Sequence, residues 1–181
     1  MEYEFGFKKG GILLPNQPDR PTTQQLMNQI RRIMTAVNQI DGTYYLAAKK
    51  MGVNENELAL LYAIGDGQLH SQKEVSEQWL IPRTTINTIV KKYQEKGLLT
   101  LHNIEGQRRE MHLCLTDAGK EYCAELLQPI YAAETAALAK TLENCSDCFI
   151  DGFAVFSQLL EQQFTQTILA PPGKDETNHE N

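Results

Sequence analysis

The sequence predicts a mainly helical protein with one small β-hairpin, an α+β fold class. Apolar residues recur at three- and four-residue spacing over most of the chain, which is the period of an amphipathic helix. Two neighbouring segments, "LLTLHN" (98–103) and "EMHLCLT" (110–116), instead alternate apolar and polar residues as strands do. With 181 residues, 41% of them hydrophobic, the chain can bury the core of one domain or of two small ones.

Neither end of the chain has a helical pattern. Glycines and prolines are spread through residues 1–21, so we expect an extended N-terminal arm there. Tyr3, Phe5 and Phe7 alternate within this arm, which either docks on a neighbour or is disordered. Residues 169–181 are almost entirely polar after Ala170, which predicts a disordered tail.

The first helix is expected within residues 22–52. Thr22 or Thr23 caps it, apolar residues follow at helical spacing, and Gly52 ends it. The pair Asp41-Gly42 predicts a bend or an interruption on the way.

Two capping boxes open the next two helices. Asn54 with Glu57, and Ser71 with Glu74, place a side-chain acceptor at the cap and a carboxylate three residues later that reaches back to the cap. Each pair therefore marks the start of a short helix.

A further helix is predicted in "IPRTTINTIVKKYQEKG", residues 81–97. Pro82 suits the first helical position, and Gly97 suits the residue just past the end. An apolar stripe at helical spacing faces the core: Ile86, Ile89, Val90 and Tyr93. The other surfaces carry basic, hydroxyl and amide groups: Arg83, Thr84, Thr85, Asn87, Thr88, Lys91 and Lys92. On this helix alone, plain solvation is the better interpretation of that polar face.

Local charge favours a binding role for this face. The whole chain has a net charge of −6, yet Arg83 to Arg109 contains six basic and two acidic residues, a net charge of +4. The rest of the chain must therefore carry −10. This asymmetry indicates one surface that faces a polyanion.

The order of helix, helix and hairpin is that of a winged helix-turn-helix. Arg108 and Arg109 fall in the loop of the predicted hairpin, where a wing meets a minor groove or its phosphates.

Two more helices complete the chain. A long helix follows Thr116, with a kink expected at Pro129, and a last helix starts near Asn144 and Asp147. The last helix has a broad apolar stripe: Phe149, Ile150, Phe153, Phe156, Leu159, Leu160 and Phe164. Because a small head cannot cover this stripe, the first and last helices predict an intertwined dimer platform, with packing within one chain as the alternative.

Residues 23–168 resemble the MarR family of bacterial transcription regulators. The resemblance rests on "SQKEVSEQWLIPRTTINTIVKKYQEKGLL" followed by "QRREMHLCLTDAGKEY", in this order and spacing. It implies a winged helix-turn-helix DNA-binding region at 53–116 and a helical dimerisation region at 22–52 and 117–168. It also implies a homodimer that binds a pseudo-palindromic operator in double-stranded DNA, and an effector that loosens DNA binding.

The resemblance also implies roles for single residues. Arg83, Thr84, Thr85, Asn87 and Thr88 would approach bases, whereas Lys91 and Lys92 would meet phosphates, as would Ser71 and Gln72 at the start of the preceding helix. Arg109 matches the family's wing arginine. The sequence departs from the family pattern at Gln107, which replaces the wing aspartate, and at Ile81 and Pro82, which replace a polar helix cap.

An effector pocket is implied between the head and the dimer platform, for a small aromatic or lipophilic molecule. Tyr44, Tyr45, Met51 and Tyr62 are candidates, although core packing also accounts for them.

Other chemistry has weaker signals. We find no nucleophile with a paired base and no glycine-rich phosphate loop, so we expect no enzyme and no cofactor. His102, Glu110, His112 and Cys114 would share one face of the hairpin, but solvated side chains are the better interpretation than a metal site.

"CSDC", from Cys145 to Cys148, suits a redox switch or half a zinc site, but helix packing is the simpler interpretation.

The sequence shows no secretion signal and no membrane span, which predicts a cytoplasmic protein. We therefore expect a homodimeric, sequence-specific repressor. A winged-helix protein-interaction module without DNA binding, and a redox- or metal-responsive regulator on the same fold, remain the alternatives.

Overall fold

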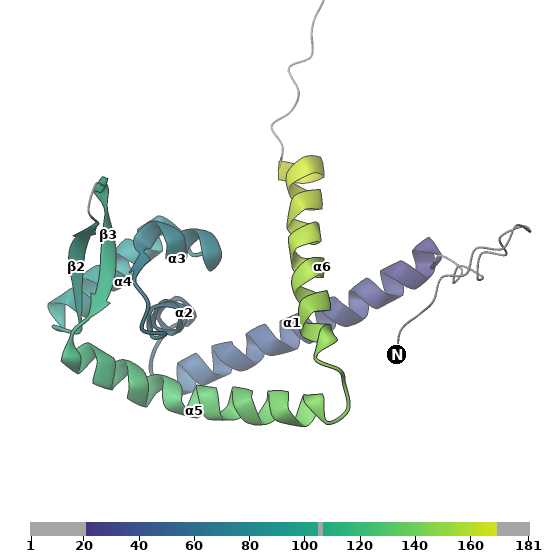
Figure 1. Ribbon diagram of the computed structural model, residues 1–181, viewed down its shortest axis with the longest axis horizontal. Coiled ribbons are helices and arrows are strands. Elements are labelled where there is room, and N and C mark those ends of the chain that lie inside the picture. The colour runs from purple at the N-terminus through teal and green to yellow at the C-terminus, as the bar shows by residue number, and fades with distance from the viewer. Residues whose placement is uncertain (1–20, 105–106, 170–181) are drawn as a thin grey trace, which may run out of the picture. The chain divides into compact units, whose positions relative to one another are not determined.

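The computed structural model describes residues 21–104 and 107–169 (Figure 1). The chain divides into two compact units, with the boundary between Cys114 and Leu115. Most of the first unit is a helical head with a small sheet, and the second unit is helical, so the predicted fold class is confirmed. The predicted N-terminal arm and C-terminal tail lie outside the described residues, except for Pro21 and Leu169.

Helix α1 spans Thr23–Lys50 and is continuous. A capping box opens it, because the Thr22 hydroxyl accepts the Gln25 N–H at 3.3 Å while the Gln25 side chain accepts the Thr22 N–H at 2.8 Å. The predicted interruption at Asp41-Gly42 is wrong. One glycine costs a helix only about 1 kcal/mol relative to alanine, which the other residues of a long helix can absorb. Gly52 follows the helix with a φ of 78°, in the left-handed region where glycine is favoured.

The predicted capping boxes of α2 (Glu55–Ile64) and α3 (Gln72–Gln78) are confirmed. The Asn54 side chain accepts the Glu57 N–H at 2.9 Å, and the Ser71 hydroxyl accepts the Glu74 N–H at 3.1 Å. In both boxes the carboxylate accepts the cap's own N–H in return. These interactions fix where each helix starts.

Helix α4 spans Arg83–Glu95. Pro82 is the cap residue and not the first helical residue, so that detail of the prediction is wrong: its ψ of 135° is extended, while its carbonyl accepts the N–H groups of Thr85 and Ile86. A proline at this place supplies no side-chain acceptor. The predicted end is confirmed, because Gly97 has a φ of 68° and donates its N–H to the Gln94 carbonyl at 2.9 Å.

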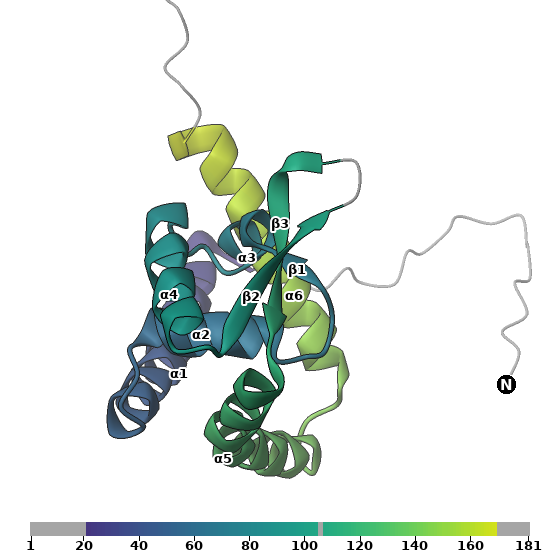
Figure 2. The same ribbon diagram turned by 90° about the vertical axis from the view of Figure 1, so that its left-hand side faces the viewer.

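A three-stranded sheet flanks these helices (Figure 2). The predicted hairpin is formed by β2 (Leu99–Ile104) and β3 (Gln107–Leu115), and the strand order is β1-β3-β2. The short strand β1 (His70–Ser71) pairs antiparallel with β3, which places His70 opposite Leu113 and Ser71 opposite His112. The strand β1 was not predicted, because two residues are too few to show an alternating pattern.

The core of the head joins α2, α3, α4 and the sheet. It is made of side chains with at most 4% exposure, among them Leu60, Val75, Ile86, Tyr93, Leu99 and Leu113. The apolar stripe predicted for α4 is buried throughout. Because α4 packs on α2, α3 and β2 through this stripe, its opposite face is left at the surface.

The second unit contains α5 (Asp117–Leu142), α6 (Cys148–Phe164) and the π-helical turn η1 (Thr165–Leu169). The Thr116 hydroxyl caps α5 by accepting the Gly119 N–H at 3.0 Å, and α5 continues past Pro129. No residue of α6 is buried, and its apolar stripe is largely exposed. Within the described ranges, no helix is long and apolar enough to cross a membrane.

Candidate nucleic-acid interface

The exposed face of α4 carries most of the side chains that the sequence analysis assigned to DNA. Arg83, Thr84, Asn87, Thr88 and Lys91 are exposed, while Thr85 is half-buried. All of them lie on one 13-residue helix whose other face is fixed in the core. The head therefore presents donors, acceptors and positive charge on a rigid element.

Intramolecular contacts on this face are weak. The Arg83 guanidinium lies 3.8 Å from the Glu77 carboxylate, and both side chains are more than 60% exposed, so water and salt screen the pair. The Thr88 hydroxyl donates to the Thr84 carbonyl at 3.0 Å, which leaves its acceptor lone pairs and its methyl group at the surface. No hydrogen bond to another described residue engages the side chain of Asn87. These groups can therefore exchange their present contacts for a ligand at little cost.

The two neighbouring lysines differ in their partners. Lys91 is 79% exposed and lies 4.0 Å from the Glu95 carboxylate, a solvated pair on one helix. Lys92 instead pairs with Glu57, whose side chain is only 4% exposed and which also closes the capping box of α2. Lys92 therefore ties α4 to α2, a structural task that its sequence position did not reveal.

Ser71 also has a structural role, because it is buried and its polar groups bond within the protein. It is only 2% exposed, its N–H donates to the Glu74 carboxylate at 2.7 Å, and its hydroxyl accepts the Glu74 N–H. The Ser71 N–H, followed by its hydroxyl, lowers the pKa of Glu74 against the opposing effect of desolvation, and His70 and His112 add smaller favourable contributions. Gln72 is the first residue of α3 and is half-buried. Of the two residues predicted to meet a phosphate at this helix start, it is the more accessible one.

Two histidines lie beside this helix start. His70 places its Nε2 2.9 Å from the Asp66 carboxylate, and His112 lies opposite Ser71 in the sheet. The pKa of Asp66 is lowered, first by the Gln68 N–H and then by the His70 ring.

The hairpin supplies the predicted wing. Gln107, Arg108 and Arg109 belong to β3, so the prediction that the two arginines fall in the loop is wrong. Their side chains lie outside the described part of the structure, and their roles stay predictions. On the neighbouring strand, the Thr100 hydroxyl lies 3.1 Å from the His102 ring and 3.3 Å from the Cys114 carbonyl. Across the described ranges, no three His, Cys, Asp or Glu side chains gather as metal ligands would.

The cysteines give no disulfide. Cys145 and Cys148 are exposed free thiols at the start of α6, and Cys114 is half-buried. Cys123 is buried, which raises the pKa of its thiol and favours the unreactive form.

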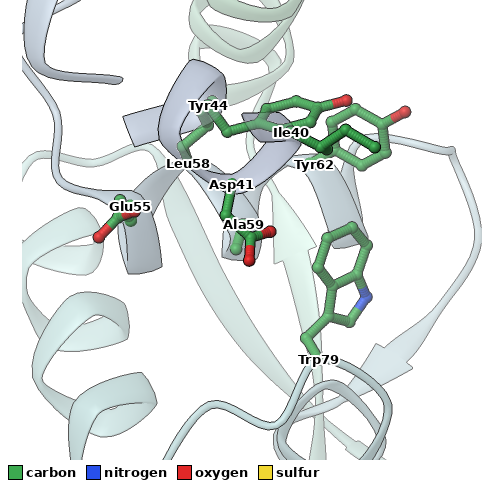
Figure 3. A pocket seen from close by; sticks show the side chains of 8 residues that line it. All are labelled: Ile40, Asp41, Tyr44, Glu55, Leu58, Ala59, Tyr62 and Trp79. Atoms are coloured by element: carbon green, nitrogen blue, oxygen red, sulfur yellow. The ribbon is translucent and has the colours of Figure 1, made fainter. Parts of the chain in front are cut away.

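A cavity of about 550 Å³ lies between α1, α2 and the end of α3 (Figure 3). Its lining contains two of the tyrosines proposed from sequence, Tyr44 and Tyr62, but neither Tyr45 nor Met51. The full lining is Ile40, Asp41, Tyr44, Glu55, Leu58, Ala59, Tyr62 and Trp79. Asp41, Glu55 and Trp79 were not predicted as cavity residues, because their spacing in the sequence does not show that three separate helices meet.

Comparison with known proteins agrees with this architecture. Residues 51–110 match the model of the MarR family. A MarR family regulator from Neisseria meningitidis has a similar structure, with a TM-score of 0.66 and 22% identity over 76% of this chain and 97% of that one. AbsC, a MarR family regulator from Streptomyces coelicolor, gives a TM-score of 0.59 and 13% identity over 81% and 98% of the two chains. No curated protein sequence matches the chain.

A third similar structure contains nucleic acid. It is overoxidized AbfR bound to DNA, a protein of Staphylococcus epidermidis, with a TM-score of 0.53 and 15% identity over 77% of this chain and 96% of that one. The helices of the head, the strand order and the flanking helices together make a winged-helix fold. Residues 51–110 thus match the MarR family model, and the described chain shares the winged-helix fold of these structures, as its motifs indicated.

Proposed function

We propose that this protein is a homodimeric transcription regulator that binds a pseudo-palindromic site in double-stranded DNA and acts as a repressor. The observation that carries the proposal is the exposed face of α4, where Arg83, Asn87 and Lys91 project from a helix anchored in the core. Asparagine can read adenine with two hydrogen bonds and arginine can read guanine, whereas a solvated lysine suits a phosphate.

The dimer part of the proposal is supported by the apolar surface of α6 and α1. Phe149, Phe153 and Leu159 on α6 are 43–53% exposed, and Leu26 and Ile30 on α1 are 44–45% exposed. Such continuous apolar stripes cost free energy in water and are removed from it when two copies pair. A symmetric dimer carries two copies of α4, which fits a site with two half-sites.

Binding to DNA is tested by selecting duplexes from a random pool with the full-length protein. We expect an enriched inverted repeat, and a loss of affinity of about 1–3 kcal/mol for Asn87→Ala on that duplex. The matched control is Lys140→Ala in the last turn of α5, which removes an exposed basic side chain from a different helix, in the second unit. A pool without enrichment, or an Asn87→Ala variant that selects the same repeat with unchanged affinity, contradicts the proposal.

The repressor part is tested separately with a reporter gene whose promoter contains the enriched repeat. Repression by the wild-type protein and relief by Asn87→Ala are the expected results. Activation of the reporter would retain DNA binding and overturn the repressor assignment.

A further inference from the structure

The cavity between α1, α2 and α3 has apolar side chains that are open to water. Ile40 and Tyr44 on α1 are 52% and 36% exposed, and Trp79, the C-cap of α3, is 39% exposed. Tyr62 of α2 belongs to the same lining, and its ring centroid lies 5.5 Å from that of Trp79 (Figure 3). Exposed aromatic and aliphatic groups that surround one hollow form a surface on which a further apolar segment can pack.

The described lining also contains two carboxylates and no basic side chain. Asp41 lies on α1, and Glu55 is the first residue of α2. Both are exposed, and among residues 21–104 and 107–169 neither forms an ion pair. The cavity therefore suits an apolar segment that ends in a positive charge.

The N-terminal arm of this chain has that composition. It begins with "MEYEFGFKKGG" and lies outside the described residues. In an extended segment every second side chain points to the same side. One face of the arm is therefore aromatic and ends in an ammonium group: Tyr3, Phe5, Phe7 and Lys9. The other face has no aromatic group: Glu2, Glu4, Gly6 and Lys8.

The arm is long enough to bring its aromatic face to the cavity of its own chain. Asp41 lies about 27 Å along α1 from the start of that helix. The segment from Phe7 to Pro21 spans up to about 46 Å when it is extended. An arm that returns along α1 therefore reaches the cavity with length to spare.

We propose that the aromatic face of the arm docks in this cavity of the same chain. The rings of Phe5 and Phe7 fill the apolar part of the lining, and the Lys9 ammonium group lies at Asp41 and Glu55. A cavity of about 550 Å³ is of the size that holds a group as large as two aromatic rings. Because the arm is tethered, docking does not cost the translational freedom of a separate molecule. The chain thus closes the cavity with its own residues, whether or not it binds DNA.

Photo-cross-linking of the full-length protein, without DNA, shows where the arm lies. p-Benzoylphenylalanine in place of Phe7 joins, on irradiation, to groups in contact with it. Mass spectrometry should find it joined to peptides of the same chain that contain Tyr44, Leu58 or Trp79. The control carries the same amino acid in place of Asn16, which is too close to α1 to reach the cavity and should give none of these cross-links.

A second measurement uses Trp79, the only tryptophan of the chain, whose quenching by acrylamide reports how open the cavity is. The double variant Phe5→Ser, Phe7→Ser should lower the docking equilibrium constant at least about tenfold, because it removes two large apolar side chains. Quenching of Trp79 should therefore increase. The matched control is Glu4→Ser, Lys8→Ser, which changes the opposite face without a change in net charge and should leave the quenching as in the wild type.

Charge reversal separates Lys9 from Lys8. Lys9→Glu places a like charge beside Asp41 and Glu55 and should also increase the quenching of Trp79, whereas Lys8→Glu on the opposite face should change it less. Acrylamide is neutral, so these changes do not act on the quencher. Adding Asp41→Lys, Glu55→Lys to Lys9→Glu should restore the low quenching.

Three results overturn the proposal: equal quenching of Trp79 in the wild type and in Phe5→Ser, Phe7→Ser; equal effects of the two charge reversals; or cross-links that avoid the cavity. Cross-links that join two chains overturn the assignment to the same chain. Failure to bind DNA counts against the proposed function and leaves these measurements intact.

Discussion

The ion pair between Lys92 and Glu57 gives a sharp test, because Lys91 beside it is a matched control. Replacing Lys92 with methionine removes the cation from a carboxylate that is only 4% exposed. Breaking a fully buried pair costs about 3–5 kcal/mol, and one hydrogen bond to a charged group contributes about 1.5–3 kcal/mol. Lys92 itself is 45% exposed, so water can partly replace the ammonium group. We therefore expect a loss of about 2 kcal/mol in the free energy of unfolding.

The assay is urea unfolding at one fixed protein concentration, since the proposed dimerisation would make the apparent stability depend on concentration. Lys91→Met removes a pair between exposed side chains and should change the free energy of unfolding by less than about 0.5 kcal/mol. For DNA binding we expect the opposite ranking, with a larger effect of Lys91→Met than of Lys92→Met. Lys91→Met should lower the slope of log affinity against log salt by about 0.9 for each phosphate contact that it removes.

A double-mutant cycle completes this test. Glu57→Gln alone and together with Lys92→Met should reveal a coupling energy above about 1 kcal/mol, because each side chain loses its partner in the other's variant. Two results would show that Lys92 does not tie α4 to α2. The free energies of unfolding of Lys91→Met and Lys92→Met would differ by less than about 0.5 kcal/mol, or the cycle would show no coupling energy.

Three further predictions concern other parts of the chain. Asn87→Ala should reduce affinity for the selected duplex but not for unrelated DNA, measured by fluorescence anisotropy; an equal loss on both would indicate a phosphate contact. Phe153→Asp on the exposed stripe of α6 should convert the proposed dimer to monomers in sedimentation velocity, whereas Gln158→Asp should not; dimers of both variants would place the interface elsewhere. The lowered pKa of Glu74 means that its ionised form stabilises the fold above its ordinary pKa of 4.5, and this contribution disappears as the pH falls through the lower, folded-state value. The difference in melting temperature between wild type and Glu74→Gln should therefore shrink from pH 7 to pH 3, and a constant difference would refute this role.

Local signals predicted most of the head correctly. Asn54 with Glu57, Ser71 with Glu74, and Gly97 are short-range features whose hydrogen bonds form within a few residues, so their spacing in the sequence is their spacing in the structure. The period of the apolar stripe likewise placed the buried face of α4. The continuous α1 shows the limit of such signals, since one Asp-Gly pair is outweighed by the helix around it.

The features that sequence reasoning missed all depend on residues distant along the chain. Lys91 and Lys92 are equivalent in the sequence, and only the position of α2 makes one of them the partner of Glu57. The strand β1 exists because β3 pairs with it, and the cavity joins α1 and α2 with Trp79. The polar face of α4 could be predicted because it depends on one helix and its neighbours in sequence.

The central claim is that two copies of α4 read one duplex. Hydroxyl-radical footprinting on a selected duplex tests it most directly, because protection reports where the protein covers the sugar-phosphate backbone. The account predicts two protected windows related by symmetry and centred about one helical turn, roughly 10 base pairs, or a multiple of it apart. Both windows should disappear with Asn87→Ala at the same protein concentration. Uniform cleavage along the duplex, or one asymmetric window that survives Asn87→Ala, would contradict the account.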